Sequence, residues 1–353
     1  MNDGDYQALL KNFPKVTFAF SYGSGVIEQS GYNKNIYEVS SKSSDTPKNV
    51  DNSNTLPLLD VIFAVDNPQA WHLENLRMNP SHYTSVITSI PSALSPQIAI
   101  LQSKLIAYVQ EEYGARVWFN THVPVGIPTS PNRLMKYGVI STKSMKRDLQ
   151  EWDNLYIAGR LHKPVRIFKN DSADVLSLLQ ANYVFAASAA ILMLSSTIPA
   201  NKDQEALKFS ESDAYLTIAS LSYTGDPRMS IAENPMKVRN LVLPVMSQYH
   251  QIYHNILENV TRIGGLSHYP DKSGSTFSST SQPADRLRMV QGLPPTLKRM
   301  VLHDSSPDAI RTAISRIVRS SATSQTLKGL FTVGLIKSGY YAWQKVKKRF
   351  DMK

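Results

Sequence analysis

VTFAFSYGSG (Val16–Gly25) and LPLLDVIFAV (Leu56–Val65) are the two stretches that decide the fold. β-branched and aromatic residues fill both, which predicts two buried strands, the first over Val16–Tyr22. The first strand runs directly into Gly-Ser-Gly, a turn whose backbone can approach a bulky ligand closely. After the second strand, Asp66-Asn67-Pro68 predicts the start of a helix with Asp66 or Asn67 as its N-cap.

Asp60 is the acidic residue inside the second predicted strand. A carboxylate buried there without a partner would be costly, so we expect either a buried salt bridge or a ligand site. The glycine backbone and the Ser24 hydroxyl can donate hydrogen bonds to phosphate oxygens, and a facing carboxylate can hold the Mg²⁺ that bridges phosphates. Strand, Gly-Ser-Gly, helix and then a strand aspartate is the layout of the nucleotidyltransferase fold. A Gly-Ser-Gly triplet alone is usually an ordinary turn, so this prediction depends on Asp60.

The second strand departs from the usual nucleotidyltransferase pattern. That pattern places two carboxylates two residues apart, whereas the residue two after Asp60 is Ile62. Asp66 is six positions further on, which is about 20 Å along an extended strand. We therefore expect Asp66 to be a helix cap rather than a ligand of the same ion. A second metal ligand must come from elsewhere in the chain.

The remaining patterns predict an α/β first half and a mostly helical second half. In the first half, the long polar segment 38–55 is expected to be a mobile loop. Helices are predicted over 96–113 and 143–152, and strands over 116–121, 134–141 and 163–168. In the second half, helices are predicted over 174–196, 204–221 and 234–257, and a Gly- and Ser-rich loop over 261–285. The predicted domains are 1–170, 171–310 and a basic tail, 311–353.

Two polar clusters interrupt the apolar patterns. Gly159–Pro164 (GRLHKP) carries Arg160 and Lys163 between a helix and a strand, which suits phosphate binding. Ser222–Arg228 (SYTGDPR) follows an apolar helix. The alternatives are an exposed basic turn in the first case and a turn with an Asp226–Arg228 pair in the second. His72 and His82 lack metal-ligand spacing, and we expect them to be structural or hydrogen-bonding residues.

The charge of the chain is concentrated at its end. The 353 residues include 38 Lys plus Arg and 28 Asp plus Glu, a formal net charge of +10. From Arg311 onward there are ten basic residues and one acid, Asp351, so the body is nearly neutral. Such a tail predicts an anionic partner, either phospholipid headgroups or nucleic acid. The absence of Cys excludes disulfides, a Cys-ligated zinc site and a thiol nucleophile.

The last part of the tail has an amphipathic pattern. On a helical wheel its apolar and aromatic residues gather on one side and most of its cations on the other, and Trp and Tyr beside Lys are typical of membrane interfaces. The predicted membrane-binding residues are Leu335, Ile336, Tyr340, Trp343, Val346, Lys345, Lys348 and Arg349. The alternatives are a solvated tail and a helix docked on its own domain. No apolar run reaches the roughly 20 residues that span a bilayer, and Val184–Leu194 is expected to be a buried helix.

Six stretches carry a resemblance to a known family. They are FAFSYGSGVIEQSGY (18–32), LDVIFAVDNPQAWHLENLRMNPSHY (59–83), KYGVIS (136–141), LYIAGRLHKPV (155–165), LSYTGDPRM (221–229) and KGLFTVGL (328–335). In this order and over nearly the whole chain, they resemble the mitochondrial translocator assembly and maintenance protein family, the mitochondrial phosphatidate cytidylyltransferases. The loops at 38–55 and 261–285 lie outside the resemblance.

The resemblance implies the reaction of CTP with phosphatidic acid to give CDP-diacylglycerol and pyrophosphate, with Mg²⁺. It implies a peripheral enzyme on the matrix side of the mitochondrial inner membrane, acting in cardiolipin synthesis. The implied architecture is a nucleotidyltransferase domain, a winged-helix-like domain and a C-terminal amphipathic helix that binds anionic phospholipid.

Residue roles follow from placing that reaction on this sequence. Asp60, Lys163 and Asp226 are the predicted catalytic residues, with Asp60 as the magnesium ligand, Asp226 the leading candidate for a second ligand and Asp66 a weaker one. The predicted nucleotide-binding residues are Tyr22, Gly23, Ser24, Gly25, Arg160 and Arg228. Two alternative functions are a nucleotidyltransferase acting on RNA and a non-catalytic inner-membrane scaffold for the protein translocase. Nucleic acid is not the expected partner, because the tail aromatics lie on one side.

Overall fold

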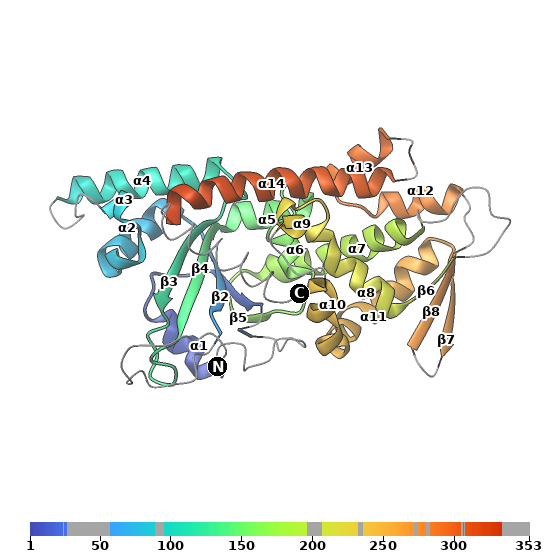
Figure 1. The fold of residues 1–353 in the computed structure, drawn as a ribbon, viewed down its shortest axis with the longest axis horizontal. Coiled ribbons are helices and arrows are strands. Elements are labelled where there is room, and N and C mark those ends of the chain that lie inside the picture. Colours follow the sequence, from blue (N-terminus) through green and yellow to red (C-terminus); the bar gives the residue numbers. More distant parts are fainter. Residues whose placement is uncertain are drawn as a thin grey trace, which may run out of the picture.

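The computed structural model describes residues 1–23, 25–26, 57–88, 95–195, 207–231, 236–271, 274–279, 283–304, 306 and 308–333. Figure 1 shows a five-stranded sheet with its helices in the first half, a largely helical second half with a small sheet, and one long helix that runs along both. The α/β character predicted for the first half is therefore confirmed.

The five-stranded sheet has the order β3-β4-β2-β1-β5. Its central pair, β2 and β4, is parallel, and the other neighbouring pairs are antiparallel. The strands are β1 (Phe18–Tyr22), β2 (Leu59–Val65), β3 (Trp118–Pro124), β4 (Leu134–Ser141) and β5 (Arg166–Asn170). All five correspond to predicted strands, with boundaries that differ by a few residues.

The two faces of this sheet are both buried, which explains the nearly continuous apolar runs of β1 and β2. Ala19, Val61 and Phe63 on one face join a core with residues of α1 (Asp3–Leu10) and α2 (Pro68–Met78). Phe20 and Ile62 on the other face join the larger core that the sheet shares with the second half. The larger core therefore joins both halves of the chain, whereas the core on the other face belongs to the first half.

α2 is also packed on α4 (Pro96–Glu112). The short elements between them are η3 (Pro80–His82) and α3 (Ser85–Thr88). Here His72 is fully buried, with its two ring nitrogens 2.8 Å from the Tyr83 hydroxyl and 2.9 Å from Gln110 Oε1. His82 lies 3.1 Å from the Tyr137 hydroxyl. The prediction that both histidines are hydrogen-bonding residues is confirmed.

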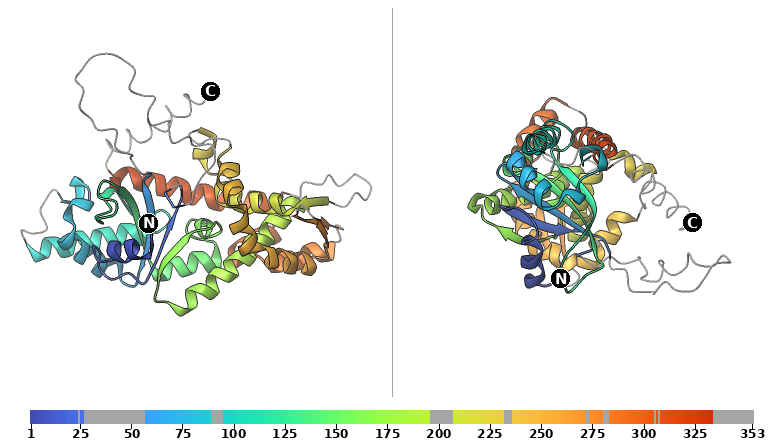
Figure 2. Two further views of the ribbon diagram at one scale, coloured as in Figure 1. Left: turned by 90° about the horizontal axis from the view of Figure 1, so that it is seen from below. Right: turned by 90° about the vertical axis from the view of Figure 1, so that its left-hand side faces the viewer.

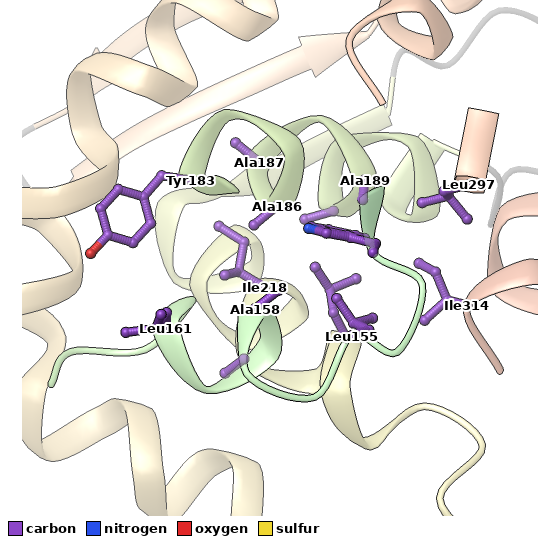
Figure 3. Close-up of a cluster of buried hydrophobic side chains, with 14 of the residues drawn as sticks. Leu155, Ala158, Leu161, Tyr183, Ala186, Ala187, Ala189, Ile218, Leu297 and Ile314 are labelled. Carbon is purple, nitrogen blue, oxygen red and sulfur yellow. The ribbon is translucent and has the colours of Figure 1, made fainter. Parts of the chain in front are cut away.

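The second half is built around α7 (Ala173–Ser195). This helix is long and apolar enough to cross a membrane, but most of its apolar stretch is buried inside the protein, as expected for a core helix. Figure 3 shows its alanines packed against Leu155, Ile218, Leu297 and Ile314, which come from four other segments.

The helices around α7 share that core. They are α5 (Thr142–Glu151), α6 (Ala158–Leu161), α8 (Glu211–Ser220), η5 (Leu221–Tyr223), α10 (Lys237–Val242), η6 (Leu243–Val245), α11 (Met246–Ile263), α12 (Pro283–Gln291) and α13 (Pro295–Leu302). The short helix α9 (Pro227–Ile231) lies between η5 and α10 in the chain. The single helix predicted over 234–257 is wrong, because α10, η6 and α11 replace it, with Pro244 at the interruption. A proline has no N–H to donate to the preceding turn.

A three-stranded antiparallel sheet, with the order β6-β8-β7, lies at the far end of the second half. It consists of β6 (Leu207–Ser210), β7 (Ser267–Asp271) and β8 (Gly274–Ser279). Two predictions are wrong here: 261–285 is not wholly a loop, and the helix predicted over 204–221 begins at Glu211, after β6. Ser, Thr and Gly hide the strand pattern, whereas Phe277 lies between Phe209 and His268 in register.

The long helix α14 (Ala309–Val333) runs along both halves, as Figures 1 and 2 show. Its first turns bury Ile310 and Ile314 in the shared core. Near its end, the Gln325 carboxamide accepts a hydrogen bond from the Ala115 N–H at 2.9 Å and donates one to the Val117 carbonyl at 3.1 Å. α14 is therefore part of the folded body, and residues 334–353 of the predicted tail lie outside the described residues.

Candidate active site

Three side chains form a polar row across the five-stranded sheet. Tyr22 of β1 and Lys136 of β4 are the register partners of Asp60 of β2. Register partners place their side chains on the same face, here the face that carries Phe20 and Ile62. The apolar face of the sheet thus ends in a hydroxyl, a carboxylate and an ammonium at the edge where β1 meets its glycine turn.

The glycine turn brings backbone close to Asp60. Gly23 has φ +78°, a conformation that favours glycine, and a Cβ at Gly23 would lie 3.4 Å from Asp60 Oδ2. A Cβ at Gly25 would collide with the Leu58 carbonyl. The buried Arg133 holds this turn by donating 2.6 Å to the Gly25 carbonyl. Ser24, the predicted phosphate donor, lies outside the described residues.

Arg160 lies against the tyrosine end of the row. Its guanidinium carbon is 3.9 Å from the centre of the Tyr156 ring and 5.3 Å from that of Tyr22, and Nη1 donates to the Tyr156 carbonyl at 2.7 Å. The buried Nε of Arg160 has no hydrogen-bond partner in the part of the chain that the structure describes. An unpaired buried donor of a charged group is expensive, so this Nε is suited to an anionic ligand.

Lys163 joins the same group of cations. Its Nζ donates to the Gly159 carbonyl and to the Ser222 hydroxyl, both at 2.8 Å. Burial, with the added repulsion of Arg160 and Lys237, lowers the pKa of Lys163 to about 7. The charge on Lys163 is therefore poorly compensated by the protein alone.

The segment after η5 completes the cluster. Gly159 lets it approach, because a Cβ there would collide with Ser222. The Asp226 side chain is almost fully buried, and Arg228 contacts both of its carboxylate oxygens, with Nη2 2.7 Å from Oδ2 and Nε 3.0 Å from Oδ1. The Asp226–Arg228 pair, which was the alternative interpretation of this segment, is present.

Electrostatics shows that the cations converge. Although burial opposes the shift, the nearby charges of Arg160, Lys136 and Arg228 lower the pKa of Tyr156. Lys163 and Lys237 place their Nζ atoms 4.7 Å and 4.9 Å from the centre of the Tyr223 ring. Cations from β4, α6, α9 and α10 thus surround two tyrosine rings beside the sheet.

A buried carboxylate fixes the loop that carries Arg160 and Lys163. Asp148 Oδ2 accepts hydrogen bonds from the N–H groups of Tyr156, Ile157 and Ala158, at 3.0, 2.7 and 3.0 Å. Ile157 is the N-cap and Ala158 the first residue of α6, and the start of a helix leaves such N–H groups unpaired, so Asp148 sets where α6 begins. The Arg160 side chain is consequently held on a rigid part of the fold.

The structure brings together Tyr22, Gly23, Gly25, Asp60, Arg160, Lys163, Asp226 and Arg228 of the predicted site residues. Asp66 lies at the opposite end of β2, where it accepts a hydrogen bond from the Thr142 hydroxyl at 2.9 Å. The N-cap of α2 is Asn67, whose side chain accepts from the Ala70 N–H. Of the two predicted caps, Asn67 is therefore confirmed, and the expectation that Asp66 is a helix cap is wrong. The helix begins at Pro68, so Asn67, directly before it, is in the capping position.

Sequence reasoning missed Lys136, Tyr156 and Lys237. Lys136 is a lone cation in an apolar strand, but its place beside Asp60 depends on the β2–β4 register, which spacing alone does not give. Lys237 comes from a segment that the sequence assigned to the first turn of a helix predicted over 234–257. The sequence signal that could have indicated these residues was the polar residues that flank the two predicted polar clusters, Gly159–Pro164 and Ser222–Arg228.

The donor set around Asp60 fits a magnesium ion. Mg²⁺ is commonly held by one or two carboxylates together with substrate phosphates and water. The partly exposed Asp60 carboxylate, beside the glycine turn and among cations suited to phosphate, meets that description. Asp226 is less available as a second ligand, because both of its oxygens are hydrogen-bonded to Arg228.

The fold and site together define an α/β protein in which a partly exposed strand carboxylate lies beside a glycine turn and a group of cations. A family model described as "Phosphatidate cytidylyltransferase, mitochondrial" matches residues 6–307 and 295–348. The chain belongs to this family, as the sequence resemblance predicted.

Curated relatives support the same assignment. A Bos taurus protein named mitochondrial phosphatidate cytidylyltransferase is 35% identical over 366 residues, covering 97% of this chain and 93% of its own length. Proteins of the same name from Danio rerio and Dictyostelium discoideum are 34% and 32% identical, covering 97% and 96% of this chain and 94% and 83% of their own lengths.

Proposed function

We propose that this chain is a phosphatidate cytidylyltransferase, which converts CTP and phosphatidic acid to CDP-diacylglycerol and pyrophosphate. The observation that carries the proposal is the convergence of Asp60, the Gly23 turn and cations from both halves of the chain on one edge of the sheet. Two substrates with phosphate groups need that much positive charge, and the family and its curated relatives are named for this activity.

The first domain, 1–170, is proposed to be a nucleotidyltransferase fold. Its support is the mixed sheet in which β1 leads into the glycine turn and the neighbouring β2 carries Asp60. The second domain, 171–310, is proposed to be winged-helix-like. It has the order α7, β6, α8, α11, β7, β8, with β8 between β6 and β7 in the sheet, so the β7–β8 hairpin would be the wing. Residues 311–353 form the third proposed unit.

Asp60 would hold the magnesium ion. A magnesium ion held there would supply positive charge that offsets part of the negative charge developing on pyrophosphate. Asp226 is proposed to act chiefly by orienting Arg228, since Arg228 occupies its carboxylate; a role for it as a second ligand remains a prediction.

The side chains of the chain would position the two phosphate groups for in-line displacement. A phosphatidate oxygen attacks the α-phosphorus of CTP, and pyrophosphate leaves, without a covalent enzyme intermediate. The turn at Gly23–Gly25 would hold the β- and γ-phosphates, and Arg160 and Lys163 would bind the charge that builds up on them. Lys136, Arg228 and Lys237 are proposed to receive the remaining phosphate, that of phosphatidate.

Phosphatidate lies in a bilayer, so the enzyme must work at a membrane. We propose a peripheral enzyme on the matrix side of the mitochondrial inner membrane, acting in cardiolipin synthesis. The relatives' names support mitochondria. The cationic and aromatic residues after Gly334 support binding to anionic phospholipid.

The direct test is to incubate the purified full chain with CTP, Mg²⁺ and phosphatidic acid in liposomes, and to measure pyrophosphate and CDP-diacylglycerol together. Equal amounts of both products are expected. Nucleotide binding without either product would support a different acceptor, RNA included. No nucleotide binding would support the scaffold function.

A further inference from the structure

A second cluster of metal-ligating side chains lies away from the candidate active site, between α8 and α11. Glu211 is the first residue of α8, and His250 and His254 are one turn apart on α11. Their ligand atoms all lie within 4.8 Å of one another, and no other group of three His, Asp or Glu residues in the described ranges meets this criterion.

The cluster is already arranged around one carboxylate. His250 Nδ1 lies 2.9 Å from Glu211 Oε2, and His254 Nδ1 lies 2.7 Å from Oε1. Both Nδ1 atoms therefore point at the same carboxylate. The two imidazole rings lie side by side, 4.4 Å apart between centroids. The Glu211 side chain is 10% exposed, whereas those of His254 and His250 are 31% and 52% exposed, which leaves a side open to solvent.

Neighbouring side chains orient the carboxylate and one of the histidines. The Tyr215 hydroxyl donates to Glu211 Oε2 at 3.0 Å. Glu258, one turn after His254 on α11, has an oxygen 3.6 Å from His254 Nε2. Hydrogen-bonded partners of this kind hold the first ligands of protein metal sites in place.

We propose that Glu211, His250 and His254 bind a divalent transition-metal ion, Zn²⁺ in particular. Two imidazoles and one carboxylate suit zinc, whose Zn–N and Zn–O distances are about 2.0–2.2 Å, better than the all-oxygen preference of Mg²⁺. Water completes the fourth position on the exposed side. The ion displaces the two His–Glu hydrogen bonds and their protons, which needs only small side-chain shifts because the ligand atoms already converge.

The ion would join α8 to α11, and α11 contacts the loop that carries Lys163. On α11, Tyr253 precedes His254 and donates from its hydroxyl to the His162 carbonyl at 2.8 Å, next to Lys163. Tyr215 of α8 is stacked on Tyr249 of α11, with ring centroids 5.7 Å apart. The zinc site therefore fixes α8 against α11 and has a structural role, separate from the chemistry at Asp60.

The experiment titrates Zn²⁺ into the EDTA-treated, dialysed full chain against a chromogenic zinc chelator, with a thermal unfolding scan at each zinc concentration. One equivalent bound at micromolar or tighter affinity is expected, with a midpoint several degrees higher. The chain has no cysteine, so thiols cannot produce the signal.

The variants are Glu211→Gln and, at the most exposed ligand, His250→Ala; each should weaken binding at least tenfold. His303→Gln, at an exposed histidine outside the cluster, is the matched control and should bind as the wild type does. Unfolding scans in EDTA show whether each variant is folded. The proposal is overturned if the wild type binds no zinc below 100 µM, or if His250→Ala, folded in EDTA, keeps the wild-type affinity.

Discussion

At the scale of the residue, the protonation of Lys163 should depend on whether the site holds a ligand. Burial and the neighbouring Arg160 and Lys237 lower the pKa of Lys163 to about 7, so near pH 8 most molecules without ligand carry a neutral amine. A bound polyphosphate would supply the missing negative charge and raise that pKa. Binding and protonation at this residue are therefore coupled.

The first prediction is that CTP binding at pH 8 takes up a proton. Isothermal titration calorimetry in two buffers with different ionisation enthalpies measures the uptake, which should approach one proton and shrink below pH 7. Lys163→Met should still bind, more weakly, without the uptake. An unchanged proton count in Lys163→Met would assign the effect to another group.

The same pKa shift affects stability in the absence of ligand. Between pH 7 and the unfolded pKa of about 10.5, the unfolded chain holds a proton at Lys163 that the folded protein does not. Stability therefore rises with pH through this window. Lys163→Met should flatten that rise, as measured by urea unfolding at pH 7 and pH 9.5; an equally steep rise in the variant would contradict the assignment.

Asp60 and Asp66 form a natural comparison, because they are two carboxylates on or just after one strand. Asp60→Asn keeps the shape and removes the charge proposed to hold magnesium. Turnover should fall below a tenth of wild type, with the unfolding midpoint within a few degrees. Asp66→Asn, at the far end and exposed, should keep wild-type turnover within about twofold. Equal losses in both variants would argue against Asp60 as the ligand.

At the scale of the element, apolar periodicity predicted the sheet and the long helices. β4 matches its predicted range, and α4, α5 and α7 match theirs within a residue or two, because apolar spacing directly records burial. β7 and β8 were missed since Ser, Thr and Gly carry little of that signal. The candidate site shows the same difference. Asp60 could be recognised from the sequence as an acidic residue in an apolar strand, whereas Lys136 is placed beside it only by the register of β2 and β4.

Two glycine substitutions test whether α14 stabilises the segment Ser222–Arg228 of the candidate active site. Gly225 has φ +83°, and a Cβ there would lie 2.6 Å from the Ser315 carbonyl oxygen of α14. Gly225→Ala should therefore destabilise the protein by about 2 kcal/mol or more, through both the backbone and the collision. Gly329 is itself on α14, and a Cβ there would have nothing within 4 Å, so Gly329→Ala should stabilise the protein by about 0.5–1 kcal/mol. Urea unfolding measures both; equal effects would mean that α14 does not support the turn.

At the scale of the whole molecule, α14 belongs to the folded body, and the predicted membrane segment follows directly after it in the chain. Gln325 and the buried Lys328 contact the first half, the latter through a 2.7 Å hydrogen bond to the Tyr113 carbonyl. The following segment, 334–353, holds six basic residues and one acid. Membrane binding and folding should therefore be separable by where the chain is cut.

Deleting 334–353 should release the protein from anionic liposomes in co-sedimentation while leaving the unfolding midpoint within a few degrees. Deleting 324–353 should also lower the midpoint, because it removes Gln325 and Lys328. Undiminished co-sedimentation of the shorter deletion would place the membrane contact elsewhere.

The position of Gln325 also has a consequence for the order in which the protein can fold. Its carboxamide satisfies backbone groups next to β3, an edge strand, across 210 positions of sequence. A chain emerging from the ribosome exposes that edge long before residue 325 exists, and unpaired strand edges promote aggregation. The first half therefore cannot complete its native contacts during synthesis. Folding should be slow and late, and the nascent chain should depend on chaperones until its final helix is available.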